Sequence, residues 1–263
     1  MNNTLYHYCS VESFHAIISG KSIRLSDLST SNDSQEGKYG ISLLCKELQK
    51  KYGYQEDPSK VIMELIADQI KGGGFCMSTQ SDSLSQWRGY ASDGHGFAIG
   101  FDKSMLESQF MRPNVELNKT NLIQVDYEET SQTNLSTSTC LKFHDFYQAI
   151  KGKKLTLENY KSNELIELAC SLYQFIYSVK TRGFIEEKEW RLFTCLFSEK
   201  SDVRPSFKGL VSFYELPLSE NQDLITDVWI GPKNLSSKKV VQAFLKSNGF
   251  DNARVSISDI SYR

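Results

Sequence analysis

Apolar and polar positions recur with a clear period over the first 25 residues. Leu5–Tyr8 alternates in character and is rich in aromatic residues, which is typical of a short strand. Val11–Ser19 places its apolar residues on one helical face, with Ser10 positioned as the N-cap and Gly20 as the stop. Ile23–Leu25 then returns to strand character. The pattern therefore predicts a compact strand–helix–strand unit at the start of the chain.

The pattern predicts two more helices before the middle of the chain. Gly40–Tyr52 and Ser59–Ile70 carry apolar residues at helical spacing, and Gly72–Gly74 follows as the signal that ends the second helix. Ser26–Gln35 is too rich in Ser, Asn and Asp to form regular structure. In Phe75–Asp102, two apolar runs bracket a polar loop, an arrangement suited to a binding site held on a rigid sheet.

The next segments predict a strand followed by a mainly helical region. Lys103–Met111 is predicted to be helical, and Leu122–Tyr127 alternates like a strand. Glu128–Ser138 is rich in Thr, Ser and Asn and is predicted to be a loop. Residues 139–180 carry a heavily aromatic helical pattern. We interpret them as a helical insertion that caps one side of the sheet.

Strand character returns after Gly183. The pattern predicts strands and one closing helix, namely strands at Glu187–Phe197, Val211–Leu216, Leu224–Ile230 and Val255–Ile257 and a helix at Ser237–Asn248. Together the elements predict one α+β domain over residues 1–263, with the helical insertion at 139–180 inside it.

Composition narrows the class of protein. With 263 residues and 40% hydrophobic content the chain can bury a full core, and a formal charge of −2 lacks the basic excess expected of a nucleic-acid-binding protein. No apolar run approaches the roughly 20 residues that span a bilayer, and the N-terminus lacks the pattern of a signal peptide. The six cysteines include no CxxC. We therefore expect a cytoplasmic protein with no membrane partner.

Several common site types lack their motifs. The four histidines show no HxH, no HExxH and no clustering with cysteine, so no metal site is expected. The chain contains no GxSxG, no GxxxxGK[ST] and no GxGxxG after a strand. A nucleophile elbow, a P-loop and a Rossmann phosphate site are therefore not supported.

The first remaining constellation is His7 on the opening strand, between Tyr6 and Tyr8 and close to Ser10. A histidine at the end of a strand can hydrogen-bond a ribose hydroxyl, and a helix N-terminus favours a phosphate. The alternative is a histidine packed between tyrosines for structural reasons only.

The second constellation is the predicted strand that begins at Glu187. Alternation would place Glu187, Glu189 and Arg191 on one face. A carboxylate oriented by an ion pair can accept a proton or stabilise a cationic transition state. The alternative is a solvated edge strand whose salt bridges are each worth about 0–1 kcal/mol.

The third constellation lies in the polar loop of Phe75–Asp102. Trp87 and Tyr90 offer stacking surfaces, with polar partners at Gln86, Arg88, Asp93 and His95. The alternative is a surface loop with a buried Trp anchor.

Motifs along nearly the whole chain resemble the bacterial family called Domain of Unknown Function 2971. They are Leu5–Ser10, Ser31–Asp33 with Glu36, Trp87–Tyr90, His95–Asp102, Glu187–Arg191, Ile230–Pro232 and Ser258–Arg263. The opening unit also resembles the first strand and helix of ADP-ribosyltransferases, with Tyr8 and Cys9 in place of the glycine and threonine of that pattern.

The resemblance to ADP-ribosyltransferases implies a mixed, mostly antiparallel split sheet and NAD as the substrate. It implies that His7 holds the nicotinamide ribose, that Trp87 or Tyr90 stacks on nicotinamide, and that Glu189 or Glu187 supports an oxocarbenium-like transition state. The wider set expected to contact the nucleotide is Tyr6, Tyr8, Ser10, Asn32, Asp33, Ser78, Trp87, Tyr90, His95 and Arg191.

The resemblance, together with the three constellations, implies an NAD-dependent ADP-ribosyltransferase-like enzyme or NAD glycohydrolase, as a toxin or phage-defence effector, with a protein or nucleic acid as acceptor. One alternative is a non-catalytic module that senses a nucleotide or a partner protein. Another is a nucleic-acid-processing component with a local groove at Arg88, Arg182 and Lys188. The sequence leaves the acceptor and the oligomeric state open.

Overall fold

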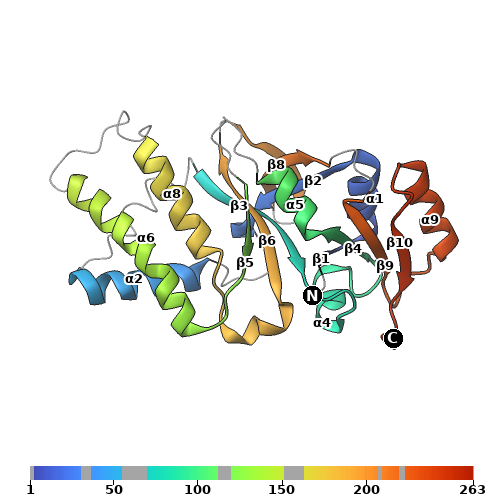
Figure 1. The fold of residues 1–263 in the computed structure, drawn as a ribbon, viewed down its shortest axis with the longest axis horizontal. Helices are drawn as coiled ribbons and strands as arrows, with labels where there is room; N and C mark the ends of the chain where they lie inside the picture. The colour runs from blue at the N-terminus through green and yellow to red at the C-terminus, as the bar shows by residue number, and fades with distance from the viewer. Residues whose placement is uncertain are drawn as a thin grey trace.

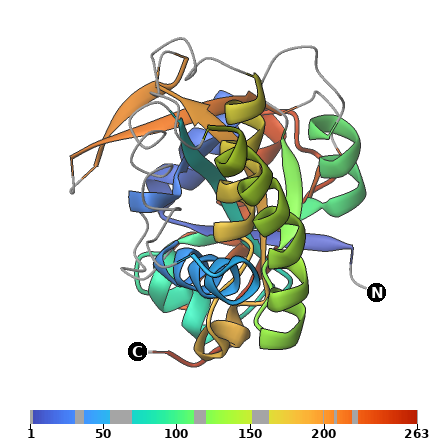
Figure 2. The same ribbon diagram turned by 90° about the vertical axis from the view of Figure 1, so that its left-hand side faces the viewer.

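The computed structural model describes residues 3–30, 37–54, 70–111, 120–150, 163–198, 200–206, 209–218 and 223–262. A long sheet runs through the molecule, with α2, α6 and α8 grouped at one end and α1 and α9 at the other (Figure 1). Figure 2, turned by 90°, shows the group of three helices from its outer side. The described residues form a mixed α+β fold with an open, mostly antiparallel sheet.

The strands have the following bounds: β1 (Thr4–Cys9), β2 (Ser22–Asp27), β3 (Ile70–Ser78), β4 (Phe97–Asp102), β5 (Asn121–Gln124), β6 (Glu189–Phe197), β7 (Asp202–Ser206), β8 (Gly209–Pro217), β9 (Ile225–Ile230) and β10 (Arg254–Ile257). The α-helices are α1 (Val11–Gly20), α2 (Lys38–Tyr52), α4 (Leu84–Tyr90), α5 (Lys103–Phe110), α6 (Glu129–Ile150), α8 (Asn163–Ile176) and α9 (Lys238–Ser247). Two 3₁₀ turns, η1 (Leu28–Thr30) and η2 (Arg182–Glu187), complete the described elements.

Strand β3 is the branch point of the sheet. One of its edges pairs with β6 along its whole length, from Ile70 opposite Phe197 to Ser78 opposite Glu189. Its other edge is shared, because β1 pairs at Ser78 and β2 pairs at Gly73–Gly74. From there β4, β9 and β10 extend the sheet beyond β1, whereas β8 and β7 extend it beyond β2. Only β9 and β10 pair in parallel among the described strands. The sheet therefore splits next to the end of β3 that meets β1 and β6.

Two large apolar clusters hold the fold together. One packs α1, α5 and α9 against β1, β2, β4, β6 and β9, and includes Ile18, Ile23 and Phe97. The other packs α2, α6 and α8 over the opposite end of β3 and β6, and includes Leu48, Phe143 and Phe193. Hydrophobic burial is the main favourable term in folding, so these clusters fix the ends of the sheet between which β1, β3 and β6 meet.

The opening unit predicted from the sequence is confirmed. The side chain of Ser10 caps α1 by accepting a hydrogen bond from the backbone N–H of Ser13 at 3.2 Å. The helix ends at Gly20, and Lys21 rather than Gly20 adopts the left-handed conformation. Strands at 211–216, 224–230 and 255–257 and the helix at 237–248 are also confirmed within a residue or two.

The prediction that Gly72–Gly74 ends a helix is wrong. The three glycines lie inside β3. A Cβ at each would lie 2.4 Å from Tyr177, 2.6 Å from Leu196 and 2.9 Å from Leu28, so the run allows bulky side chains to cover the strand closely. Most of the helix predicted at 59–70 lies outside the described residues, and Ile70 itself begins β3.

The predicted loop at Glu128–Ser138 is also wrong, because α6 begins at Glu129. Its Ser/Thr-rich first half packs polar groups inward. The Gln132 side-chain amide, fully buried, donates hydrogen bonds to the carbonyls of Asp126 and Lys180 at 2.7 and 2.8 Å. Because the buried face of this part of α6 is polar, the sequence showed no apolar residues at helical spacing there. Helices α6 and α8 lie on either side of residues 151–162, and the interpretation of 139–180 as an insertion stays a prediction. None of the helices in the described ranges combines the length and apolar character needed to cross a bilayer.

Candidate functional site

A cavity opens where β1, β3, α4 and the start of β6 meet. A water-sized sphere can move within about 60 Å³ of it, and the empty space of about 330 Å³ around that volume includes open solvent. Strands β1 and β3 contribute Tyr6, His7, Tyr8, Cys76 and Met77, and the facing side consists of Gln86, Tyr90, Glu187 and Glu189. The enclosed volume is well below that of a typical ligand pocket, so at most one ring of a larger ligand would lie inside it.

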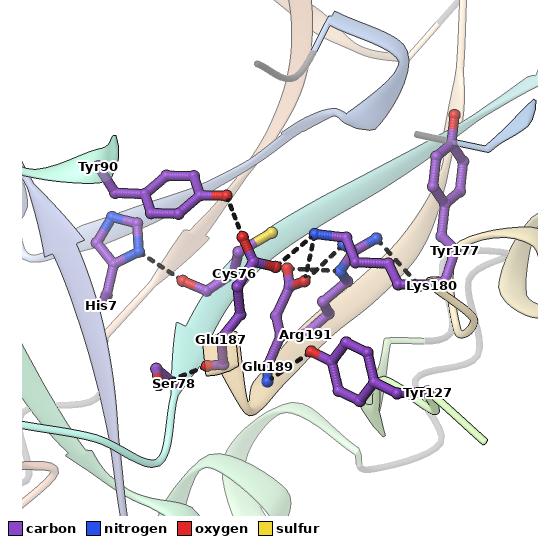
Figure 3. A network of polar contacts seen from close by, with 10 residues as sticks. All are labelled: His7, Cys76, Ser78, Tyr90, Tyr127, Tyr177, Lys180, Glu187, Glu189 and Arg191. Atoms are coloured by element: carbon purple, nitrogen blue, oxygen red, sulfur yellow. Dashed lines mark hydrogen bonds and ion pairs between the residues drawn. The ribbon is translucent and has the colours of Figure 1, made fainter. Parts of the chain in front are cut away.

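Two carboxylates and two cations form one buried cluster on the β6 side of this cavity (Figure 3). Arg191 grips Glu189 through two hydrogen bonds, from Nε at 2.7 Å and from Nη2 at 2.8 Å. Lys180 Nζ lies between the two acids, 2.8 Å from Glu187 Oε2 and 2.9 Å from Glu189 Oε2. The lysine is therefore the element that joins the two carboxylates into one group.

Backbone contacts place each member of the cluster. Lys180 follows α8, and its N–H donates to the carbonyl of Asp126 at 3.0 Å. A further hydrogen bond of the Arg191 guanidinium, from Nη1, reaches the carbonyl of Tyr177 at 3.0 Å. Ser78 Oγ, at the end of β3, donates to the carbonyl of Glu187 at 2.7 Å. Segments far apart in sequence thus meet at the sheet's branch point.

Glu189 is held in its charged form. Burial alone would raise the pKa of its carboxyl, but the charges of Arg191 and Lys180 and their hydrogen bonds outweigh burial and lower this pKa to about 2. Only 8% of its side chain is exposed, and both of its oxygens accept hydrogen bonds from cations. Glu189 is therefore a fixed negative charge rather than a group that exchanges protons near neutral pH.

Glu187 is placed differently from the sequence prediction. It ends η2 rather than lying on β6, and Lys188 between the two acids adopts the left-handed conformation with φ 44°. Glu187 Oε2 accepts from Lys180, and Oε1 accepts a hydrogen bond from the Tyr90 hydroxyl at 2.7 Å. Glu189 and Arg191 do share a strand face, but Glu187 reaches the same site through the turn.

His7 contributes a neutral imidazole to the cavity. Its Nδ1 lies 2.7 Å from the carbonyl oxygen of Cys76, which can only accept, so Nδ1 carries the proton and Nε2 is left as an acceptor. Desolvation by burial lowers the pKa of His7 to about 4, against a smaller raising effect of the Cys76 hydrogen bond. The ring also stacks on Phe75, with 3.9 Å between centroids. His7 is therefore both packed and available to a ligand.

Two tyrosines border the carboxylates. Tyr90 exposes 41% of its surface, while its hydroxyl turns inward to Glu187; burial of that hydroxyl and the Glu187 charge raise its pKa. The Tyr127 hydroxyl accepts a hydrogen bond from the backbone N–H of Glu189 at 3.1 Å, and burial raises the pKa of Tyr127 to about 12. Of the two aromatic residues predicted to stack on a ligand, Tyr90 is the one that lines the cavity.

The prediction of Trp87 as a stacking surface is wrong. Its side chain is completely buried beside Tyr8, at 4.8 Å between ring centroids, and its indole N–H donates to Asp82 Oδ1 at 2.6 Å. Residues 84–90 form helix α4, so the predicted loop contains a helix. One face of α4 buries Gln86 and Trp87, whereas Tyr90 lies at its end. Trp87 therefore anchors helix α4, which presents Gln86 and Tyr90 to the cavity.

Like Tyr90, Tyr6 and Tyr8 of the predicted nucleotide-binding set line the cavity, whereas the others have structural roles or lie elsewhere. Ser10 caps α1, Ser78 fixes Glu187, and the Tyr8 hydroxyl donates to the carbonyl of Gln80. Arg191 is 1% exposed and acts through Glu189. His95 is exposed, contacts the carbonyl of Ser92 and does not line the cavity, and Asn32 and Asp33 lie outside the described residues.

Sequence reasoning missed Lys180 and Tyr127. Neither belongs to a motif, since Lys180 follows a helix and Tyr127 lies between a short strand and a helix. For Lys180, the signal in the sequence was one charged residue directly after an apolar segment. Such a signal is too common to identify a site residue. No group of three or more His, Cys, Asp or Glu within the described ranges is arranged to hold a metal ion.

Comparison with protein families gave one match. Residues 86–192 match the model described as "Protein of unknown function (DUF2971)". The matched span contains residues 86–90 of α4 and Glu187–Arg191, so it supports the resemblance inferred from the sequence for one side of the cavity. His7 on β1 and the C-terminal motifs lie outside the match. Searches of curated proteins and of solved structures gave no match.

Proposed function

We propose that the chain binds the nicotinamide end of NAD in this cavity and breaks the bond between nicotinamide and ribose. The ADP-ribose group would pass to a macromolecule, as in an ADP-ribosyltransferase, or to water, as in an NAD glycohydrolase. The single observation that carries the proposal is the convergence of His7, Tyr90, Glu187 and Glu189 on one cavity. The β1–α1–β2 unit adds support, because the resemblance to ADP-ribosyltransferases rests on it.

The proposed reaction needs no group that the cavity lacks. The bond between the anomeric carbon and the ring nitrogen breaks, and its electron pair neutralises the pyridinium as nicotinamide leaves. The positive charge moves to the ribose as an oxocarbenium ion, which a nearby preorganised carboxylate stabilises. The oxygen of water or of an acceptor then bonds to the anomeric carbon, and its proton passes to Glu187 or to solvent.

Within this proposal His7 binds the ribose. Nε2 is the acceptor nitrogen because Nδ1 donates to the carbonyl of Cys76, so a ribose hydroxyl can donate to it. The lowered pKa of about 4 keeps the imidazole neutral at physiological pH, so no positive charge from His7 opposes the developing oxocarbenium ion. Tyr90 then offers its partly exposed ring as the surface on which nicotinamide stacks.

The two carboxylates would divide the work. Two acids beside two cations leave the cluster formally neutral, so it acts through the position of its charges rather than through net charge. Both Glu189 oxygens are held by cations, whereas one Glu187 oxygen has a neutral partner, the Tyr90 hydroxyl. We therefore assign Glu187 to the reacting ribose and Glu189 to holding Lys180 and Glu187 in place.

One observation favours a second candidate, a module that senses a nucleotide without chemistry. The engagement of both Glu189 oxygens by Arg191 and Lys180 is what a purely structural ion cluster would also require. Such a module would bind the same ligand and release no nicotinamide. The two candidates therefore differ in turnover and not in binding.

The test is incubation of the pure protein with NAD, with released nicotinamide measured by liquid chromatography. We expect release by the parent chain and a loss of at least about a hundredfold in Glu187→Gln, the order of magnitude of a lost acid–base or electrostatic group. Glu186→Gln is the matched control, because Glu186 is exposed and does not line the cavity. No release by a folded parent chain, or full release by Glu187→Gln, would contradict the proposal.

A further inference from the structure

Gln86 is a buried polar residue without a partner in the described part of the molecule. It is 7% exposed and lines the cavity from helix α4. No hydrogen bond joins its side-chain amide to another described residue. The amide atoms open onto the cavity, since neither is among the buried side-chain atoms of the described residues that lack a partner. A ligand in the cavity can therefore hydrogen-bond the amide directly, in place of water.

The neighbouring polar groups are already occupied. The Tyr8 hydroxyl donates to Gln80, the Tyr90 hydroxyl donates to Glu187, and both acids accept from cations. His7 offers an acceptor at Nε2 and no donor. The Gln86 amide therefore offers the cavity a donor and an acceptor side by side, which matches a ligand group carrying an acceptor beside a donor.

The charges in the cavity further limit which ligand group could pair with Gln86. Glu187 and Glu189 both line it, and their partner cations Lys180 and Arg191 are 6% and 1% exposed and do not. An anionic ligand group beside Gln86 would thus face carboxylates, with the cations behind them. A neutral planar amide satisfies Gln86 without that repulsion.

We infer that Gln86 is the specificity-determining residue for a primary carboxamide on the ligand's aromatic ring. This rests on the proposed function for the nature of that ring: Gln86 pairs with the carboxamide of nicotinamide and selects against nicotinate, which carries a carboxylate at the same position. Gln86 donates to the carboxamide oxygen and accepts from its NH₂ group. Trp87, the next residue, is fully buried and fixes the helix that aims it.

The test measures binding and not turnover. Nicotinamide and nicotinate are each titrated by saturation-transfer NMR into the parent chain and three variants, Gln86→Leu, Gln86→Glu and Gln242→Glu. Gln242 lies exposed on α9 and serves as the matched control for the added charge. Circular dichroism establishes that each variant is folded.

We expect the parent and Gln242→Glu to bind nicotinamide at least about tenfold more tightly than nicotinate, the factor that corresponds to one net hydrogen bond. Gln86→Leu should weaken nicotinamide more than nicotinate and reduce the preference about tenfold, since nicotinamide loses two hydrogen bonds and the nicotinate carboxylate, which can only accept, loses at most one. Gln86→Glu should weaken both ligands. Equal binding of the two ligands by the parent, or unchanged preference in Gln86→Leu, would overturn the inference.

The outcome is separable from that of the NAD assay. If nicotinamide is released from NAD but Gln86→Leu keeps the parent's preference, the reaction stands and the role of Gln86 falls. If the parent prefers nicotinamide through Gln86 and releases none from NAD, the carboxamide site stands and the proposed reaction falls.

Discussion

Among the described residues, two groups place a lysine against a carboxylate in very different surroundings. The pocket cluster consists of Lys180, Glu187, Glu189 and Arg191, whose side chains are between 1% and 13% exposed. The tail clamp consists of Asp93, Lys233 and Tyr262, in which the Asp93 side chain is 54% exposed. In both, a lysine ammonium meets a carboxylate, at 2.8 Å in one and 2.7 Å in the other, and lies over an aromatic ring.

The comparison shows that geometry alone does not set the importance of an ion pair. The tail clamp closes onto the turn after α4, where Asp93 accepts from Lys233 and from the Tyr262 hydroxyl in contact with solvent. Water screens that pair and can replace either partner. In the pocket cluster each charge depends on the others, because little water reaches the four side chains. Substitutions in the two groups should therefore differ sharply.

The largest effect is expected from Arg191→Leu. It removes both guanidinium bonds to Glu189 and leaves a carboxylate buried with only Lys180. We expect the free energy of unfolding to fall by about 3–5 kcal/mol, measured by urea denaturation. The matched control is Arg254→Leu, at an arginine whose side chain is 80% exposed near Asp227, and it should be almost silent. A stable Arg191→Leu would remove the distinction between the two groups.

An intermediate effect is expected from pH, through His7. Its pKa is about 4 in the folded chain and 6.5 ordinarily, so the unfolded chain binds more protons between these values and stability falls as pH drops from 6.5 to about 4. Allowing for the ring's partial exposure, the loss is on the order of 2 kcal/mol.

The measurement is urea denaturation across that pH window in the parent chain and in His7→Asn, which keeps a donor for the Cys76 carbonyl. Acids common to both chains cancel in the difference between them. If the two profiles have the same slope, His7 is not desolvated as described.

The smallest effect is expected from Lys233→Ala in the tail clamp. Hydrogen bonds from Lys233 and Tyr262 lower the pKa of Asp93, but the carboxylate faces water and keeps Tyr262 when the lysine is removed. The urea midpoint should stay within experimental error, and added salt should have little further effect. A loss comparable to that of Arg191→Leu would show that the clamp is as essential as the buried cluster.

Local patterns in the sequence predicted elements well where propensity and packing agree. The β1–α1–β2 unit followed from a capping serine, three apolar residues on one helix face and a glycine. The local patterns gave wrong predictions where packing overrides propensity. Glycines at 72–74 ordinarily end a helix, yet here they admit Tyr177, Leu196 and Leu28 against a strand. The Ser/Thr-rich start of α6 was hidden because its buried groups are polar and satisfied internally.

The candidate site was predictable in part, for a related reason. His7, Tyr90 and the two glutamates each stood out by residue type near the end of an element, and all four line the cavity. Trp87 stood out equally, but its size made it an anchor instead of a ligand surface. Lys180 joins the acids only because α8 and Asp126 bring it there, a contact between distant segments that no local pattern encodes.

Because Lys188 is left-handed, the two acids can reach the same lysine only at their present separation of two residues along the chain. The 3₁₀ turn η2 ends at Glu187, Lys188 has a positive φ, and β6 begins at Glu189. This change of backbone conformation lets both carboxylates reach Lys180. Adding one residue in this turn would either move Glu187 away from Lys180 or pull the start of β6 out of its pairing with β3. Insertions or deletions within residues 187–189 would therefore be tolerated less well than substitutions there.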